Sequence, residues 1–381
     1  MIIEKIYPLT HKIEPDFAWK GLRRFHNVNF VRDTIIETHN VQRKHQNLAR
    51  KQAEQIRLCL IQAHEYHHSF NHATLLTKPT LLYYSIMYLA IAEFLFKGTG
   101  DVSLDKARAK HRHHGLIFSC DERLKSERRL DVSASLLSAK PMLSGGKRIG
   151  TFHLWHSFAR EHPYIGPHRR VTSNSSTTSH SIILNANSKK LSVIPETGVN
   201  FMKCLKNFPG SKSYIELNSI HSELARASIR VDVDLVRDKF SITLILHPDT
   251  KEKLDKIYSK IEFHPNYFER LVIDEFESGL QLRFDSSSLG GANFPIGFNS
   301  SGSEVLLCSD NDFINEFGLA YLGMFICGNF SRYYPDIWVK HLDEATPLAL
   351  AIEDFTNSAS RRAPLLTLSE LSRGLFVDCS V

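Results

Sequence analysis

The chain has 381 residues, of which 42% are hydrophobic and 23% are charged. These proportions are typical of a globular protein with a core, and they exclude a collagen-like rod, a coiled coil and a wholly disordered chain. The net charge of +6 permits contact with nucleic acid but does not require it. Histidine is unusually frequent, because 11 of its 20 residues precede position 115.

The cysteines and the first residues together predict a cytoplasmic protein. The six cysteines are widely spaced and form no Cys-x-x-Cys pair, which is typical of buried thiols in a reducing compartment. Residues 1–5 do not begin a signal peptide, because no basic segment is followed by an apolar one. The apolar run at 80–96 contains a single charge, Glu93, and three internal tyrosines. We expect this run to be a buried core helix, without a membrane span.

In chain order, the first part of the sequence predicts mainly helices. Residues 1–32 are expected to be an irregular leader, followed by a helical N-terminal domain with short strands over 33–170. Apolar residues spaced by three and four predict one long amphipathic helix from 33 to 70. A second helix is expected at 80–96, and a short one at 151–160. The Ser/Thr/Asn-rich stretch at 171–181 is predicted to be a surface loop.

The rest of the chain is predicted to form two further sections with different secondary structure. Residues 182–305 predict a mixed α/β section, and residues 306–381 predict a helical C-terminal section. Alternating apolar residues favour a strand pair at 228–235 and 240–247, and Asp249 favours the start of a helix. The predicted fold class is therefore α+β, with helical ends around a mixed centre.

Basic residues recur on the predicted first helix. The five residues are Arg43, Lys44, Arg50, Lys51 and Arg57. Steps of seven residues place three of these side chains nearly in line along a helix, where like charges repel. The stripe is therefore expected to face an acidic partner, either nucleic acid or a protein. A solvated face neutralised by distant carboxylates is the alternative.

The sharpest local motif is His-Glu-x-x-His at residues 64–68. Two histidines one turn apart on a helix, next to a glutamate, suit a zinc site that activates water. His64 and His68 would be ligands, and Glu93 on the next helix would be the third. A helix end rich in histidine is the alternative, and we expect the fold to need no metal or other cofactor.

A second cluster contains Arg108, His113 and His114, just before Gly115. An arginine separated from a histidine by four to six residues occurs in the ribonuclease sites of HEPN proteins, which are helical bundles. Pairs with this spacing are no more frequent here than chance predicts, and Ala109 stands where such sites usually carry a polar residue. The alternatives are therefore a catalytic pair and a structural turn in which His114 precedes a strand.

A third group includes Arg332 and Trp338 within the segment 328–338, which is rich in aromatic residues. An arginine flanked by aromatic rings can stack on them and bind the carbonyls at a helix end. It can also form an anion or nucleotide site. Both interpretations stay open from the sequence.

Three stretches together resemble the bacterial YaaC-like family. They are Pro79–Tyr84, His114–Leu116 and Gly328–Trp338, and their order and separation resemble that family over about residues 35–378. The resemblance implies helical ends around a mixed centre and implies no reaction. Some relatives resemble subunits of anti-phage systems that are encoded beside an ATPase.

Together these observations predict a non-ATPase subunit of a bacterial multi-protein assembly, active in anti-phage defence, that contacts nucleic acid or an ATPase partner. Residues 1–114 contain 17 Lys and Arg against 10 Asp and Glu, which favours a polyanionic partner. The alternatives are a HEPN-type ribonuclease and a zinc-dependent hydrolase. The sequence leaves open whether the protein is an enzyme.

Overall fold

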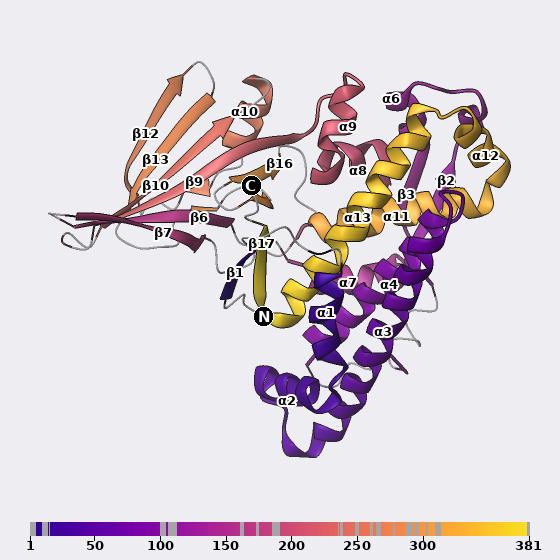
Figure 1. Ribbon diagram of the computed structural model, residues 1–381, viewed down its shortest axis with the longest axis horizontal. Coiled ribbons are helices and arrows are strands. Elements are labelled where there is room, and N and C mark those ends of the chain that lie inside the picture. The colour runs from indigo at the N-terminus through magenta and orange to yellow at the C-terminus, as the bar shows by residue number, and fades with distance from the viewer. Residues whose placement is uncertain are drawn as a thin grey trace.

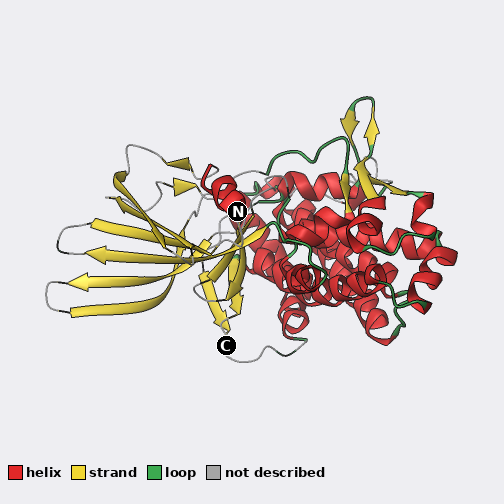
Figure 2. Ribbon diagram, turned by 90° about the horizontal axis from the view of Figure 1, so that it is seen from above, coloured by secondary structure: helices red, strands yellow, loops and turns green. Residues whose placement is uncertain are grey.

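A computed structural model gives the arrangement of most of the chain. The residues that it describes are 5–9, 14, 16–99, 104–105, 113–160, 164–172, 175–184, 191–234, 236, 239–247, 251–259, 262–263, 268–276, 279–286, 292–293, 297–301, 304–308 and 314–378. Helices gather in one part of the molecule, and a large sheet extends from it (Figures 1 and 2). The fold is α+β with helical ends, as the sequence predicts.

Helix α4, Lys78–Lys97, is the centre of the helical part. It packs against α3 (Gln46–His72), α7 (Thr151–Phe158), α11 (Glu316–Tyr333) and α13 (Pro347–Ser372). Pro79 suits its first turn, since the amide that proline lacks has no partner within a helix there. Its apolar residues face neighbouring helices on several sides, so the predicted core helix is confirmed.

The remaining described helices are shorter than α4, and all but α10 lie with this core, whereas α10 lies beside the large sheet (Figure 1). Those in the first half are α1 (Phe17–Leu22), η1 (Arg23–His26), α2 (Val28–His39), η2 (Arg43–His45), η3 (Glu122–Lys125), α6 (Leu130–Ser133) and η4 (Ala134–Leu136). Those in the second half are α8 (Phe201–Asn207), η5 (Pro209–Ser211), α9 (Lys212–Leu217), α10 (Lys251–Ser259) and α12 (Pro335–Asp343).

The main sheet has eight strands and is largely antiparallel. Its main path runs through β12 (Phe268–Phe276), β13 (Gly279–Ser286), β10 (Lys239–His247), β9 (Leu224–Asp234), β16 (Glu304–Cys308) and β15 (Gly297–Ser301). The hairpin β6 (Tyr164–Thr172) and β7 (Ser175–Leu184) joins it through a parallel pairing with β9. The predicted strand pair in the mixed section is therefore confirmed as β9 and β10.

Four small sheets complete the structure. The first pairs β1 (Lys5–Leu9) in parallel with β17 (Gly374–Asp378), so the two ends of the described chain lie together (Figure 1). The second joins β2 (Leu116–Cys120), β3 (Leu137–Pro141) and β8 (Val199–Asn200). The others are β4 (Leu143–Ser144) with β5 (Lys147–Arg148), and β11 (Glu262–Phe263) with β14 (Ala292–Asn293).

The predicted helix at 33–70 is wrong, because the chain breaks between α2 and α3. Asn40 ends α2 in the left-handed conformation at φ 48°, which asparagine tolerates better than most residues. Arg43 and Lys44 therefore lie in η2, and only Arg50, Lys51 and Arg57 lie on α3. The basic residues do not form one continuous helical stripe.

Two segments that were expected to be irregular are ordered elements. The leader contains α1 and η1, because Trp19, Leu22 and Phe25 recur every three residues and are buried. The predicted loop at 171–181 falls largely within β6 and β7, apart from residues 173–174, which lie outside the described part. The threonines of this segment suit strands because they branch at Cβ.

Within the described residues, α4 is the one helix that is long and apolar enough to cross a membrane. Most of its apolar stretch is buried inside the protein, as expected for a core helix. Cys59, Cys120, Cys204 and Cys327, whose side chains the structure describes, form no disulfide bonds.

Candidate functional site

The three stretches that carry the family resemblance meet at one end of α4. Thr80 of the first stretch donates from its hydroxyl to the Gly328 carbonyl at 3.1 Å, and its oxygen lies 2.9 Å from the Ser331 hydroxyl. Gly328 allows this approach, because a Cβ there would meet the Tyr83 side chain at 3.1 Å and the Pro79 carbonyl at 3.2 Å. The close packing of α4 on α11 therefore favours a small residue at this position.

His114 lies against the same end of α4. Its Nδ1 is 2.7 Å from the hydroxyl of the buried Tyr83, and its ring also packs near Tyr84 and Phe325. Burial lowers the pKa of His114, and the neighbouring positive charges of Arg332 and His113 lower it further. His114 is therefore a neutral imidazole at neutral pH, able to accept a proton.

Two glycines hold the backbone that presents His114. Gly115 has φ +87° and Gly150 has φ +99°, and a Cβ on Gly150 would lie 2.1 Å from the Gly115 Cα. The first amides of α7 then bind this segment: Thr151 N–H donates to the His113 carbonyl, and Phe152 N–H donates to the His114 carbonyl, both at 3.0 Å. The backbone at His114 is therefore held both by the close approach of the two glycines and by the hydrogen bonds from α7.

Arg332 completes the group at the end of α11. Its Nη1 donates to the Tyr84 hydroxyl at 2.8 Å, and its guanidinium lies 5.0 Å from the centre of the Tyr333 ring. Within the described part of the chain, no carboxylate forms an ion pair with Arg332. Its charge is therefore available to an anionic ligand.

Tyrosine rings extend this group along α3 and α4. Tyr66 stacks on Tyr84 with ring centres 5.3 Å apart, and on Tyr88 with ring centres 5.9 Å apart. All three are partly exposed. We call the set Tyr66, Tyr83, Tyr84, His114 and Arg332 the Tyr–His–Arg cluster. The sequence analysis did not identify Tyr66 as a site residue, because Tyr66 lies inside the His-Glu-x-x-His motif. Tyr84 and Tyr88, one helical turn apart, are the signal in the sequence that could have indicated an aromatic surface on α4.

The proposed zinc site is not formed by the described residues. No three of their His, Cys, Asp and Glu side chains come together in a way that could hold a metal ion. The His64 ring packs on Trp19 at 4.9 Å, and the His68 ring lies 4.6 Å from that of His72. Glu93 instead points into the core, where its oxygens accept from Trp155 and Thr367.

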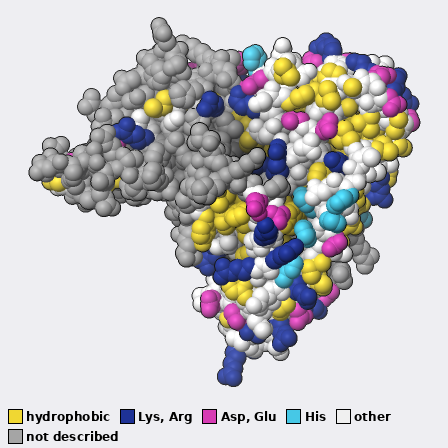
Figure 3. Space-filling model, in the orientation of Figure 1, with side chains coloured by type: hydrophobic (Ala, Val, Ile, Leu, Met, Phe, Trp, Pro, Cys, Tyr) yellow, Lys and Arg dark blue, Asp and Glu magenta, His cyan; other side chains and the backbone are white. Residues whose placement is uncertain are grey.

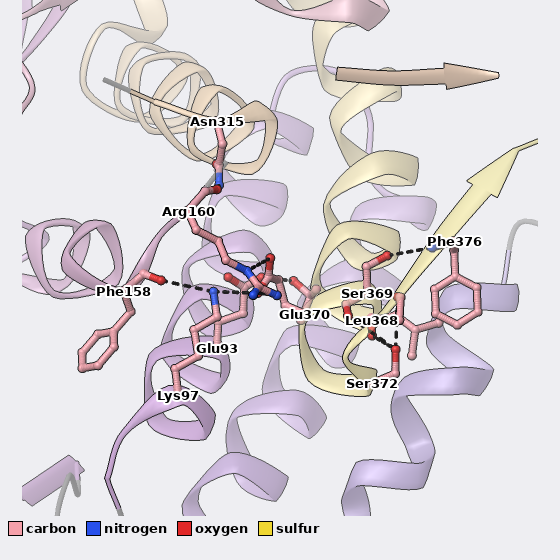
Figure 4. Close-up of polar contacts among 12 residues, drawn as sticks. Glu93, Lys97, Phe158, Arg160, Asn315, Leu368, Ser369, Glu370, Ser372 and Phe376 are labelled. Carbon is pink, nitrogen blue, oxygen red and sulfur yellow. Dashed lines mark hydrogen bonds and ion pairs between the residues drawn. The ribbon is translucent and has the colours of Figure 1, made fainter. Parts of the chain in front are cut away.

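Glu93 belongs to a buried charged network, drawn in Figure 4. Glu370 pairs with Lys97 at 2.8 Å and with Arg160 at 3.2 Å, and all three side chains are at most 8% exposed. Burial raises the pKa of Glu93 to about 7, and Glu370 adds to this while Lys97 opposes it. The network joins α4 to α13, so Glu93 has a structural place in the described fold.

The other predicted residues divide between the core and the surface. Trp338 is fully buried and donates to the Leu76 carbonyl at 3.2 Å, so it is a core residue and is not open to a partner. Arg50 pairs with Glu54 at 3.3 Å, and Lys51 pairs with Asp105. Arg108 lies outside the described residues, so its pairing with His113 or His114 stays a prediction.

Comparison with known proteins supports the family resemblance over part of the chain. Residues 23–134 match the family model described as YaaC-like Protein. This range includes α4 and His114 but not Arg332. No curated protein and no solved structure matches the chain. The chain is therefore YaaC-like over this segment, and its function has to be inferred from the site.

Proposed function

We propose that this YaaC-like protein is a cytoplasmic subunit of a bacterial assembly that binds single-stranded nucleic acid at the Tyr–His–Arg cluster. The observation that carries the proposal is that an arginine without a carboxylate partner among the described residues lies beside stacked, partly exposed tyrosines and a neutral histidine. These groups come from α3, α4, α11 and the segment before β2.

The chemistry of each group suits one part of a nucleotide. The Arg332 guanidinium matches the geometry of phosphate oxygens. The partly exposed rings of Tyr66 and Tyr84 are aromatic surfaces on which bases can stack, and such stacking is worth about 1–3 kcal/mol per base. Stacking needs unpaired bases, so a single strand fits this surface better than a duplex.

A binding assay on the full chain tests this proposal. Fluorescence anisotropy with a labelled single-stranded RNA is expected to show saturable binding that weakens with salt. Arg332→Ala is expected to weaken binding about tenfold and to reduce the salt slope by about one. Arg32→Ala on α2 is the matched control, since Arg32 is paired with Asp33 at 2.7 Å. Equal affinities for the wild type and Arg332→Ala would reject the site.

The role in an assembly is the wider part of the proposal. The family resemblance supports a non-ATPase subunit that acts beside an ATPase in anti-phage defence. Co-expression with the ATPase encoded nearest to the gene, followed by size-exclusion chromatography, is expected to give one stoichiometric complex. Separate elution of the two proteins, together with unchanged phage sensitivity of a deletion strain, would refute this role.

A HEPN-type ribonuclease is the second candidate function. It is favoured by the neutral His114, which can take the proton of an RNA 2′-hydroxyl, and by Arg332, which stands close enough to lower its pKa. In this version Arg332 supplies the positive charge that the sequence assigned to Arg108. Cleavage of labelled RNA, its absence with 2′-deoxy RNA, and its loss in His114→Ala would support this function. Binding of RNA without cleavage would reject the ribonuclease and leave RNA binding as the function.

A further inference from the structure

A second group of positive and imidazole side chains lies on the other side of α3. Its members are Arg23, His26, Arg57 and His64, which we call the η1–α3 basic cluster. Arg57 and His64 are seven residues apart, two helical turns, and share one face of α3. Arg23 and His26 are the first and last residues of η1, which packs on that helix.

Buried aromatic residues hold these two elements together. Phe25 of η1 is 2% exposed and contacts Phe96 edge to face, with ring centres 5.8 Å apart. Trp19, just before η1, is 5% exposed and packs against the rings of His64 and His67, each at 4.9 Å. The backbone of η1 is therefore anchored, while Arg23 remains exposed above it.

The packing of η1 on α3 places both histidines within electrostatic range of the arginines. Burial lowers the pKa of His26, and Arg57, Arg23 and His64 lower it further. The pKa of His64 is lowered by burial and by Arg23 and His68, while Glu65 opposes the shift. Both imidazoles are therefore neutral near pH 7, and each keeps one N–H donor.

The two arginines of this cluster have no acidic partner in the described structure. Some neighbouring cations do have one, since Lys20 pairs with Glu14 at 2.7 Å and Arg50 pairs with Glu54, whereas Arg24 lies over the Phe30 ring. No carboxylate of the described residues pairs with Arg23 or Arg57, and no hydrogen bond to another described side chain holds the rings of His26 and His64. Figure 3 shows dark blue and cyan side chains gathered over α1 and α3.

We propose that the η1–α3 basic cluster is a binding site for a phosphate group. Two guanidiniums offer forked donors to phosphate oxygens, and two neutral imidazoles add one N–H donor each. An anion here would be attracted by both guanidiniums, since both lie near enough to His26 to lower its pKa. The phosphate belongs either to a free nucleotide or to a nucleic-acid backbone, since both present the same oxygens.

This site does not depend on the proposed function. Tyr66 faces α4 through Tyr84, whereas His64 faces α1 through Trp19, so the Tyr–His–Arg cluster and the η1–α3 basic cluster use opposite faces of α3. Loss of one site is expected to leave the other unchanged.

The test uses inorganic pyrophosphate and isothermal titration calorimetry on the full chain. The wild type is expected to bind with a Kd of about 1 mM or tighter. Arg23→Ala combined with Arg57→Ala is expected to weaken binding at least about tenfold, and Arg57→Glu is expected to abolish it. Arg50→Ala is the matched control, because Arg50 is exposed on the same helix and already paired with Glu54. Unchanged thermal melting shows that each variant is folded.

A second arm identifies the source of the phosphate. The site holds a nucleic-acid backbone if pyrophosphate displaces a labelled single-stranded RNA from the wild type. In that case the displacement is expected to disappear in the double variant and to persist in Arg332→Ala. If ATP binds and the RNA is not displaced, the site holds a free nucleotide. Absence of saturable pyrophosphate binding up to about 10 mM, or equal affinity in the wild type and the double variant, would overturn the proposal.

Discussion

At the scale of single residues, the properties of His114 come from its neighbours. Its Nδ1 lies 2.7 Å from the Tyr83 hydroxyl, and the positive charge of Arg332, a residue distant in the sequence, disfavours protonation of the ring. Arg332 in turn is held by Tyr84 and Tyr333 without a carboxylate among the described residues. A neutral base and an uncompensated positive charge are thus kept side by side.

We expect Arg332→Ala to raise the pKa of His114. Removing a nearby positive charge makes protonation of the imidazole easier, while the burial that lowers its pKa remains. NMR titration of the His114 ring proton measures this directly, and Arg123→Ala, an exposed arginine paired with Asp121 at 2.9 Å, is the control. An unchanged His114 pKa in Arg332→Ala would show that the two side chains do not interact.

At the scale of elements, the site depends on how α7 meets the segment before β2. The positive φ of Gly150 and its contact with Gly115 allow the two backbones to pass within van der Waals distance. The first turn of α7 then donates two amides to the carbonyls of His113 and His114. This junction sets the position of the His114 backbone, and the contact with Tyr83 orients the ring.

Gly150→Ala is expected to destabilise the protein by about 2 kcal/mol or more. The new Cβ would lie 2.1 Å from the Gly115 Cα, and alanine at φ +99° is strained even without that contact. Urea unfolding measures the loss. Gly145→Ala is the control, because Gly145 has φ +55° but nothing within 4 Å, so only the backbone strain of about 1 kcal/mol applies. Equal losses in the two variants would contradict the role of the close contact.

At the scale of the whole molecule, the buried charged network connects parts of the chain that are distant in sequence. Glu93 of α4 accepts from Trp155 of α7 and from Thr367 of α13, and Glu370 of α13 holds Arg160. The Asn315 side chain before α11 donates to the Arg160 carbonyl at 2.8 Å. The network therefore fixes the relative position of four helices.

The network predicts that stability falls as pH rises from about 5 to 7. Glu93 has a pKa of about 7 in the fold against 4.5 ordinarily, so the folded state binds a proton that the unfolded state has lost. The stabilisation by this bound proton is complete below the pKa of the unfolded state and is lost as the pH rises through the pKa of the folded state. Between the two values the free energy of unfolding falls by about 1.4 kcal/mol per pH unit. Urea unfolding at several pH values measures this slope.

Glu93→Gln removes the titrating group and is expected to flatten the slope in that range. Other groups, including histidines, titrate in both proteins, so the difference between wild type and variant is the quantity to compare. A variant with the full wild-type slope would show that Glu93 is already ionised in the fold at pH 5.

Local sequence patterns determined several of the helices and part of the sheet. The proline and the apolar run predicted α4, and alternating residues predicted β9 and β10, because periodicity and backbone constraints act between near neighbours. The break at Asn40 carried a local signal too, since asparagine favours the left-handed end of a helix, but the apolar spacing on either side obscured it.

Only the tertiary structure decided the site. His114 meets Tyr83 across 31 residues, and Arg332 meets Tyr84 across 248 residues. Tertiary packing also decided that Glu93 enters the core, that Trp338 is buried and that Arg57 remains unpaired among the described residues while Arg50 is paired. The physical reason is that burial, charge pairing and the pKa of a side chain depend on what lies within a few ångströms of it, and those neighbours come from distant parts of the chain.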